Sequence, residues 1–389
     1  MRISAAVSRT ADTAIAAAEA ADAARVDLSG GCDLAVAFVT PDHADGLEAA
    51  ATAVEMHLEP GVLLGAVAQG IVGPREEVED GTGVVVWAAH LGTGGSVRPL
   101  RAWTLQQPEG GVAVVGWPDT AVGEVTLVLA DPFSFPAAEL ASYVGDHRPG
   151  QVLAGGLVTG GPGKSRFALD DRVYEDGAVG VVLSGVGVDT VVSQGCRPVG
   201  DPLTVTAAER NRILELGGEP AAARLQELLV AADADDRELL QRGGLHVGLV
   251  VDEVRDAYDT GDFLIRGVLG VDPTDGAVTI GDVAAVGQTI QFQVRDGRSA
   301  DRDLAAKLDG AGRAAGTLLF TCNGRGRRLF GTPDHDVGAV QRWLGGPVGG
   351  AFCAGELGPV GKKSYLHGFT ASLVVFRDHR DGNEPPGST

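Results

Sequence analysis

The sequence has few cysteines and no long apolar run. Its four cysteines, Cys32, Cys196, Cys322 and Cys353, lie far apart without a C-x-x-C pair, so neither a zinc site nor a disulfide framework is indicated. No window approaches the roughly 18 uncharged apolar residues of a membrane-spanning helix. The N-terminal stretch carries acidic residues where a signal peptide needs an apolar run. We therefore expect a cytoplasmic protein without a membrane segment.

Positive charge is also scarce. The chain has 31 Lys plus Arg against 52 Asp plus Glu, which gives a formal net charge of -21 at pH 7. This field repels phosphate backbones and anionic lipid headgroups, so we expect no nucleic-acid partner and no membrane partner. Abundant glycine and alanine beside few lysines are typical of a GC-rich bacterial genome.

The rest of the composition is that of a globular protein. The 389 residues are 44% hydrophobic and 21% charged, and this length exceeds what one hydrophobic core usually serves. We expect an α+β protein of two α/β modules, with mixed or antiparallel sheets flanked by helices. The predicted units are an N-terminal domain (1–205), a helical connecting region (206–244), a C-terminal domain (245–376) and a disordered tail (377–389).

Hydrophobic periodicity predicts the individual elements. Apolar residues at helical spacing, with capping residues, predict helices at 10–25, 42–58, 137–146, 206–216, 219–230, 236–241, 300–311 and 334–344. Apolar runs punctuated by glycine predict strands at 33–39, 61–67, 83–91, 96–100, 125–130, 152–158, 177–183, 190–194, 245–251, 263–269, 289–294, 317–322, 349–353 and 369–376.

The two halves share an ordered pair of motifs. The tetrapeptide TPDH at 40–43 recurs at 332–335, each time at the start of a predicted helix. The following strand recurs too, because GAVAQGIVGP at 65–74 resembles GAFCAGELGP at 350–359. We infer a duplicated strand, helix, strand unit in which Glu356 stands where the first copy has Ile71. Chance similarity between glycine-rich segments is the alternative.

Arg266 lies inside an apolar predicted strand, on the same face as Leu264 and Val268. A buried guanidinium is unfavourable unless a carboxylate or a ligand pairs with it. If the strand is at a sheet edge, Arg266 faces water instead. We expect Arg266 or Arg325 to lie within hydrogen-bonding reach of Glu356, directly or through a ligand.

Cys322 ends an apolar predicted strand, next to Asn323 and near Arg325. Nearby arginines lower the pKa of a thiol, so Cys322 is a candidate nucleophile with His335 or His367 as its base. The alternatives are that Cys322 lines a ligand pocket or packs as an ordinary buried cysteine.

Other motifs give no support for nucleotide or metal binding. The segment GGLVTGGPGKS at 155–165 has the composition of a phosphate-binding loop but not its spacing. The histidines form no metal-binding pattern. A single axial haem ligand needs no spacing, so His57 and His367 are possible ligands, against a solvated or capping role.

Several segments together resemble the FIST family, named for F-box and intracellular signal transduction proteins. Their ordered set spans nearly the whole folded chain. In sequence order the segments are LLGAVAQGIVG (63–73), LADPFSFP (129–136), LAGGLVTGG (153–161), GAVGVVLSG (177–185), VSQGCRPVGDPLTVT (192–206), GDFLIRGVLGVDP (261–273), LLFTCNGRG (318–326) and GAFCAGELGP (350–359).

The resemblance implies an N-terminal and a C-terminal FIST domain that act as a sensory input and bind small ligands such as amino acids. Some bacterial relatives are described as haem-binding nitric-oxide sensors, but the residues here do not support haem, and we expect no cofactor. Eukaryotic relatives carry an F-box and serve as ubiquitin-ligase substrate receptors. Because no F-box, kinase, receiver or methyl-accepting segment is recognisable here, we expect the output to pass to a separate protein partner.

We expect a stand-alone sensory protein that binds an amino acid or a small carboxylate, rather than an enzyme. The predicted ligand-binding residues are Arg266, Cys322, Asn323, Arg325, Gly326, Cys353, Gly355 and Glu356. The alternatives are a cysteine-dependent hydrolase or transferase that uses Cys322, and a protein-interaction scaffold with an exposed apolar patch. The sequence gives no prediction of the oligomeric state.

Overall fold

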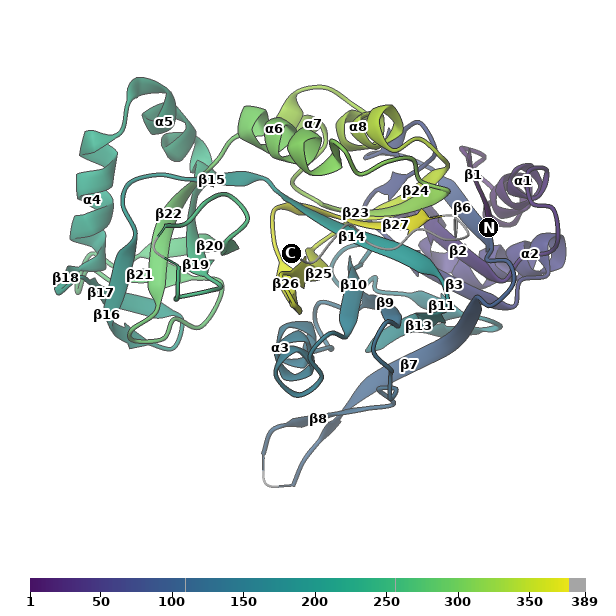
Figure 1. The fold of residues 1–389 in the computed structure, drawn as a ribbon, viewed down its shortest axis with the longest axis horizontal. Helices are drawn as coiled ribbons and strands as arrows, with labels where there is room; N and C mark the ends of the chain where they lie inside the picture. The colour runs from purple at the N-terminus through teal and green to yellow at the C-terminus, as the bar shows by residue number, and fades with distance from the viewer. Residues whose placement is uncertain (109, 256, 378–389) are drawn as a thin grey trace, which may run out of the picture.

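Three β-sheets surround one central apolar core, and a small barrel lies beside them (Figure 1). The computed structural model describes residues 1–108, 110–255 and 257–377. Helices pack on the outer faces of the sheets. The predicted α+β class is confirmed.

The first sheet has one parallel pair of strands, β2 and β3, and its other neighbouring pairs are antiparallel. A 3-10 turn (Pro41–Gly46) and α2 (Leu47–Leu58) connect the parallel strands. Together with α1 (Thr13–Arg25), α2 covers the outer face of the sheet. In order across the sheet, the strands are β1 (Arg2–Ser8), β6 (Val84–His90), β2 (Leu34–Val39), β3 (Val62–Val67), β11 (Phe167–Leu169) and β12 (Arg172–Tyr174).

The second sheet repeats this pattern around the parallel pair β9 and β10, which α3 (Ala137–His147) connects and covers. The hairpin of β7 and β8 extends away from the body (Figure 1). In order across the sheet, the strands are β8 (Val112–Val115), β7 (Ser96–Gln106), β13 (Ala178–Ser184), β9 (Val125–Ala130), β10 (Val152–Leu157), β25 (Gly355–Val360) and β26 (Lys363–His367).

The third sheet is built around the parallel pair β23 and β24. The connection between them contains α7 (Arg327–Phe330) and α8 (His335–Trp343), and α6 (Gly297–Leu308) packs beside α8 on the outer face. In order across the sheet, the strands are β14 (Gly187–Gln194), β27 (Thr370–Arg377), β23 (Gly316–Cys322), β24 (Val348–Cys353), β4 (Ile71–Val72) and β5 (Glu77–Val78).

The three sheets are copies of one unit that exchange hairpins in a cycle. In each unit, the hairpin that follows the second parallel strand leaves its own sheet and joins another. Hairpin β4–β5 joins the third sheet, β11–β12 joins the first and β25–β26 joins the second. The two predicted copies are therefore both parallel strand, helix, strand units, and β9–α3–β10 is a third that the sequence analysis did not recognise.

The strand register puts Glu356 at the same place in this repeat as two apolar residues. Ile71 lies opposite Ala351, Phe167 lies opposite Ala66, and Glu356 lies opposite Gly156. All three side chains are fully buried. The predicted match of Ile71 with Glu356 is thus confirmed, and Phe167 is its third member. One copy of a repeated apolar position carries a carboxylate.

The inner faces of all three sheets supply the central core. Phe38 of the first sheet meets Phe320 of the third edge to face, with ring centroids 6.2 Å apart. Trp87 and Phe376 also meet across these two sheets, with ring centroids 4.9 Å apart and ring planes tilted by 43°. Because the core and two of the sheets combine strands from both predicted domains, the two halves support each other's packing.

A closed antiparallel barrel lies between β14 and α6 in the chain. Its ring closes because β22 pairs with β16 on one edge and β19 on the other. Apolar side chains such as Val247 and Phe292 fill the interior, so the barrel is a packed core and not a pore. The ring order is β16 (Leu203–Glu209), β17 (Arg212–Leu216), β21 (Val278–Ile280), β20 (Phe263–Val271), β19 (Leu245–Val250) and β22 (Thr289–Arg295).

Short elements complete the barrel region. The strands β15 (Cys196–Pro198) and β18 (Glu219–Pro220) pair with β22 and β17. The helices are α4 (Ala221–Ala231) and α5 (Ala234–Leu239), and a π-helical turn (Leu240–Gly244) leads into β19.

The prediction of a helix at residues 206–216 was wrong. This segment forms the hairpin of β16 and β17, with Arg210 in the left-handed region at φ 55°. Ile213 and Leu216 are buried in the barrel interior, so their burial in the barrel outweighed the helical spacing of the apolar residues. The predicted helical connecting region accordingly contains strands as well as α4 and α5.

Other differences are local. The strand β1 was not predicted, and neither were the short strands β4, β5, β8, β11, β12, β15, β18, β21, β25 and β26. Residues 378–389 of the predicted tail lie outside the described residues, while Arg377 ends β27. No helix within the described ranges is long and apolar enough to span a bilayer.

Candidate functional site

Chemically active side chains gather where the parallel strands β23 and β24 end. Cys322 and Cys353 are the last residues of these strands and lie side by side in register. The loop after β23 carries Asn323 and Arg325, and α7 and then α8 follow it. The carboxyl ends of parallel strands are a frequent place for ligand sites, because the loops that leave them converge there.

A buried ion pair fixes this loop. Arg325 donates from Nε to Asp336 Oδ2 at 2.7 Å and from Nη2 to Oδ1 at 2.8 Å, and both side chains are fully buried. The Thr321 hydroxyl donates to the same carboxylate at 2.7 Å, and His335 Nδ1 lies 3.0 Å from it. Burial alone would raise the pKa of Asp336, but the charge and hydrogen bonds of Arg325 hold it well below its ordinary value.

The ion pair leaves one guanidinium nitrogen free. Arg325 Nη1 is buried and has no hydrogen-bond partner among the described residues. It lies close to Gly195, where an added Cβ would come within 3.5 Å of Nη1 and 2.4 Å of the Phe369 carbonyl oxygen. Glycine at this position therefore lets the chain that leaves β14 pass close to the Phe369 carbonyl, with the guanidinium beside it.

Glu356 is the second charged group of the site. Its Oε2 accepts hydrogen bonds from the backbone N–H of Thr370 at 3.1 Å and from the Thr370 hydroxyl at 2.7 Å. Its Oε1 is buried and has no partner within the described part of the chain. Burial raises the pKa of Glu356 to about 8, although the Thr370 hydrogen bonds and the charges of Arg325 and Arg295 act to lower it.

Arg295 brings a second guanidinium to the site from the barrel. It lies opposite Cys196 at the end of β22 and donates from Nη2 to the carbonyl oxygen of Gly324. Its guanidinium lies over the Phe369 ring, 5.5 Å from the ring centroid. No carboxylate forms an ion pair with Arg295 in the described residues, and burial lowers its pKa.

The family follows from comparison with known proteins. Residues 33–219 match the FIST N domain, and residues 221–359 match the FIST C domain. The chain belongs to the FIST family. An uncharacterized protein of Mycobacterium tuberculosis is 45% identical over 390 residues, which cover 97% of this chain and 100% of that protein. An uncharacterized protein of Mycobacterium bovis is 44% identical over 392 residues, with 97% and 99% covered.

FIST domains are associated with sensory roles in signal transduction. In this FIST protein, six of the predicted ligand-binding residues lie in or next to the site. These are Cys322, Asn323, Arg325, Cys353, Gly355 and Glu356. Asn323 donates its backbone N–H to Cys353, and its side-chain Oδ1 is buried without a partner among the described groups. Whether these residues bind a ligand stays a prediction.

Arg266 and Gly326 have other neighbours. Arg266 Nε bonds Asp282 at 2.6 Å and Nη2 donates to the Leu366 carbonyl at 3.2 Å, so its carboxylate partner is Asp282 and not Glu356. Gly326 lies at φ 60°, where an added Cβ would be 2.6 Å from the carboxylate of Glu79. Neither Arg266 nor Arg325 bonds Glu356 directly among the described hydrogen bonds, which leaves the route through a ligand.

The sequence analysis did not identify four residues of the site that come from other parts of the chain. Asp336, Arg295, Cys196 and Thr370 were not predicted. For Arg295 a signal was available, because Gln291, Gln293 and Arg295 alternate with apolar residues along the predicted strand at 289–294. Asp336 follows the repeated TPDH motif directly, but nothing in the sequence indicates that it pairs with Arg325.

The structure gives a nucleophilic Cys322 no support. The thiol is buried, and burial raises its pKa to about 12, so the reactive thiolate is not populated near neutral pH. His335 is bonded to Asp301 and Asp336, while His367 Nε2 bonds the Gly358 carbonyl. Neither predicted base is hydrogen-bonded to Cys322 among the described contacts.

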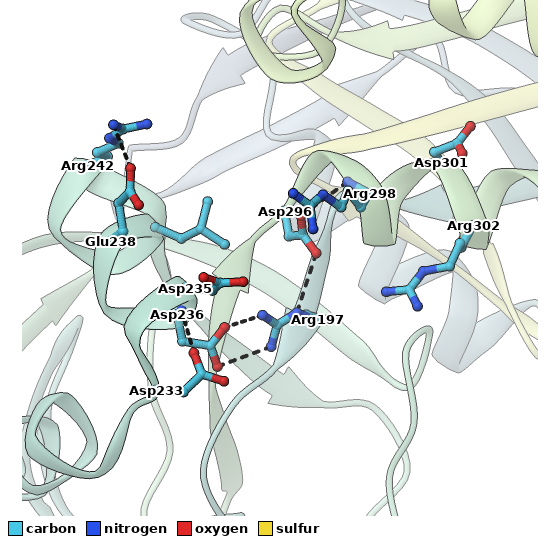
Figure 2. A pocket seen from close by; sticks show the side chains of 11 residues that line it. Arg197, Asp233, Asp235, Asp236, Glu238, Arg242, Asp296, Arg298, Asp301 and Arg302 are labelled. Carbon is cyan, nitrogen blue, oxygen red and sulfur yellow. Dashed lines mark hydrogen bonds and ion pairs between the residues drawn. The ribbon is translucent and has the colours of Figure 1, made fainter.

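A charged surface groove of about 860 Å³ opens between α5 and the start of α6. Figure 2 shows Arg197 in this groove between Asp236 and Asp296, which are its ion-pair partners. Asp301 of the groove reaches His335 at 3.1 Å, and His335 contacts Asp336. A chain of contacts therefore joins the groove to the buried ion pair. No cluster of three or more metal-ligating side chains occurs in the described ranges.

The raised pKa of Glu356 predicts that stability falls as pH rises. Between its ordinary value of 4.5 and about 8, the folded protein keeps a proton that the unfolded chain has released. The free energy of unfolding should therefore fall with a contribution of up to about 1.4 kcal/mol per pH unit from this group. Urea unfolding of the wild type and of Glu356→Gln at pH 5 to 8 measures it. The free energy of unfolding should fall less steeply with pH in Glu356→Gln than in the wild type. The exposed control variant Glu48→Gln should follow the wild type. Parallel profiles of the wild type and Glu356→Gln would contradict the assignment.

The buried thiol predicts slow alkylation. At pH 7.5, iodoacetamide should modify Cys322 in the folded protein far more slowly than in the urea-unfolded chain, because the folded thiol is protonated and covered. Peptide mass spectrometry gives the rate for each cysteine. Modification of folded Cys322 at or above the unfolded rate would restore the nucleophile hypothesis.

Proposed function

We propose that this FIST protein is a sensory protein that binds a small molecule with an acidic group, such as an amino acid or a small carboxylate, between the third sheet and the barrel. The observation that carries the proposal is the pair of buried, unpartnered atoms Arg325 Nη1 and Glu356 Oε1. Unpaired buried polar groups are costly and uncommon in proteins. Their place in the site suggests that a ligand supplies their partners.

The two atoms fit opposite ends of an amino acid. A guanidinium N–H donates to a carboxylate, and a carboxylate oxygen accepts from an ammonium group. Arg325 is held by Asp336 through its other nitrogens, so its free Nη1 is already oriented. A small carboxylate fits as well, because protonated Glu356 can donate a hydrogen bond to it.

The origin of Glu356 in the repeat supports the same proposal. The equivalent positions hold Ile71 and Phe167, whose burial is compatible with an apolar environment. Neither packing nor the repeated fold requires a carboxylate at this position, and burying one is unfavourable. A binding role explains why one copy differs.

The output of the sensor is a further part of the proposal. We infer that ligand binding is relayed to a separate protein partner in the cytoplasm, and the contacts of Asp301, His335 and Asp336 offer one route to the surface. The scaffold alternative has one observation in its favour, an apolar groove of about 660 Å³ between β8 and α3 that includes Val112, Trp117 and Tyr143.

The binding proposal is tested by two conservative substitutions. Arg325→Lys keeps a positive charge for Asp336 but lacks the second guanidinium nitrogen that would bind the ligand. Glu356→Gln keeps the shape of the side chain but cannot become negatively charged. Both variants should bind amino acids at least tenfold more weakly than the wild type, which corresponds to one lost charge-assisted hydrogen bond of about 1.5 kcal/mol or more. Isothermal titration calorimetry against an amino-acid panel measures the affinities.

The matched control is Glu77→Gln. Glu77, in β5, has the same character as Glu356: it is buried with its pKa raised to about 8, its Oε1 accepts from the Val337 N–H at the start of α8, and its Oε2 has no partner among the described residues. Its substitution should leave the affinity unchanged. In thermal unfolding, a true ligand at about 100 times its Kd should stabilise the wild type by about 2.7 kcal/mol. A panel without any binder, or equal affinity in Arg325→Lys and Glu356→Gln, would contradict the proposal.

A further inference from the structure

The outer face of β22 is polar yet buried. Along this strand Ile290 and Phe292 point into the barrel, so Gln291, Gln293 and Arg295 point outward by the alternation of a strand. An outward residue of a barrel usually faces water, but the Gln293 side chain is 0% exposed. Gly248 and Phe263 of the barrel lie against it, and Arg295 occupies the next outward position of the strand.

The amide of Gln293 has no hydrogen-bond partner on either atom. Both Nε2 and Oε1 are buried and unpartnered within the described residues. The amide lies against Gly248 and the Phe263 ring, because an added Cβ at Gly248 would be 2.7 Å from Nε2 and 2.9 Å from a Phe263 ring carbon. The absence of a Cβ at Gly248 makes room for the amide.

A second buried glutamine contacts the backbone of the same residue, Phe263. Gln194 Nε2 donates to the Phe263 carbonyl at 2.7 Å, and the backbone N–H of Gln194 donates to Asp303. Because only the NH₂ group can bond a carbonyl, the orientation of this amide is fixed and its Oε1 is left as an acceptor. That oxygen is buried and has no partner in the described part of the protein.

These amides border the charged site. Phe263, Cys196 and Phe369 belong to one apolar cluster between the barrel and the body. Phe369 lies under Arg295 and precedes Thr370, the partner of Glu356. Arg325 Nη1 lies close to Gly195, the residue before Cys196. Charged groups and neutral amides therefore lie around the same cluster.

We propose that Gln293 and Gln194 form a subsite for a neutral carboxamide, so that the ligand is an α-amino acid or similar molecule ending in a primary amide. This inference rests on the proposed function and names the ligand class of the same site. A carboxamide offers one acceptor oxygen and two N–H donors. Gln293 Nε2 donates to the oxygen, Gln293 Oε1 accepts the first N–H, and Gln194 Oε1 accepts the second.

The same atoms discriminate against related ligands. A carboxylate end would face two acceptor oxygens, Gln293 Oε1 and Gln194 Oε1, without a proton between them. An aliphatic end would leave all three buried amide atoms unpaired, which is the arrangement by which polar sites reject apolar analogues. Glutamine and asparagine are therefore the natural probes, with glutamate, aspartate and norleucine as their matched competitors.

The experiment is a calorimetric titration of the full chain with these five amino acids. The wild type should bind glutamine or asparagine about 10- to 100-fold more tightly than the corresponding acid and norleucine, as expected for the loss of one or two buried hydrogen bonds. Gln293→Met, which keeps a similar volume without the amide, should abolish this preference. The matched control is Gln151→Met, since Gln151 is another buried glutamine with both amide atoms unpartnered among the described residues, at the start of β10.

The outcomes separate this inference from the proposed function. If the wild type binds amino acids in a manner sensitive to Arg325→Lys and Glu356→Gln but shows no preference for the amide, the carboxamide subsite is refuted and the binding site survives. If the preference persists in Gln293→Met, the subsite is likewise refuted. If no amino acid binds the wild type, both proposals fall. The wild-type selectivity alone decides the matter if Gln293→Met does not fold.

Discussion

The buried ion pair of Arg325 with Asp336 is the constraint on which the site depends. Removing two charges from water is costly, and the pair is tolerated because the carboxylate also receives the Thr321 hydroxyl and contacts His335. Loss of either partner would leave the other buried and uncompensated, at a cost of about 3–5 kcal/mol. The pair thereby ties the end of β23 to the start of α8 and sets the direction in which Arg325 Nη1 points.

The threefold repeat explains why the site lies where it does. Each unit contributes a hairpin to a neighbouring sheet. The residue at the matching position of each hairpin therefore packs between two units. Two such positions hold Ile71 and Phe167 and serve packing alone, whereas the third holds Glu356. The barrel is inserted in the same unit, between β14 and α6, and brings Arg295 to the site. Repetition supplies the scaffold, and a single substitution together with one insertion supplies the chemistry.

Local pattern was sufficient for the parallel strands and most of the covering helices of the three units, because these have long apolar faces. The short strands of the exchanged hairpins were not predicted. The helix α1 begins where a capping residue was expected, with the Asp12 side chain accepting the N–H of Ile15. The match of Glu356 with Ile71 also followed from sequence, since the flanking glycines preserve the alignment. The barrel strands at 203–216 were missed because their short, charge-bearing hairpin has helical apolar spacing, and only closure of the ring makes them strands.

Long-range pairing explains the remaining errors. Arg266 was one of the two arginines expected within hydrogen-bonding reach of Glu356, yet Asp282 lies 16 residues further along the same barrel and is its carboxylate partner. No sequence pattern indicates that Arg325 would pair with Asp336, or that the outward Gln293 of the barrel would be fully buried. Each of these contacts depends on how the units are placed around the shared core.

The central claim is that neutral, buried Glu356 becomes the anionic partner of a ligand ammonium group. Because its pKa is raised to about 8, the carboxyl group is largely protonated at pH 7, and binding an ammonium requires it to lose that proton. Titration calorimetry of the amino-acid ligand at pH 7, in two buffers of different ionisation enthalpy, counts the protons exchanged. The account predicts that the wild type releases about one proton per ligand bound and that Glu356→Gln releases none. Binding without proton release, or with equal release in both proteins, would contradict it.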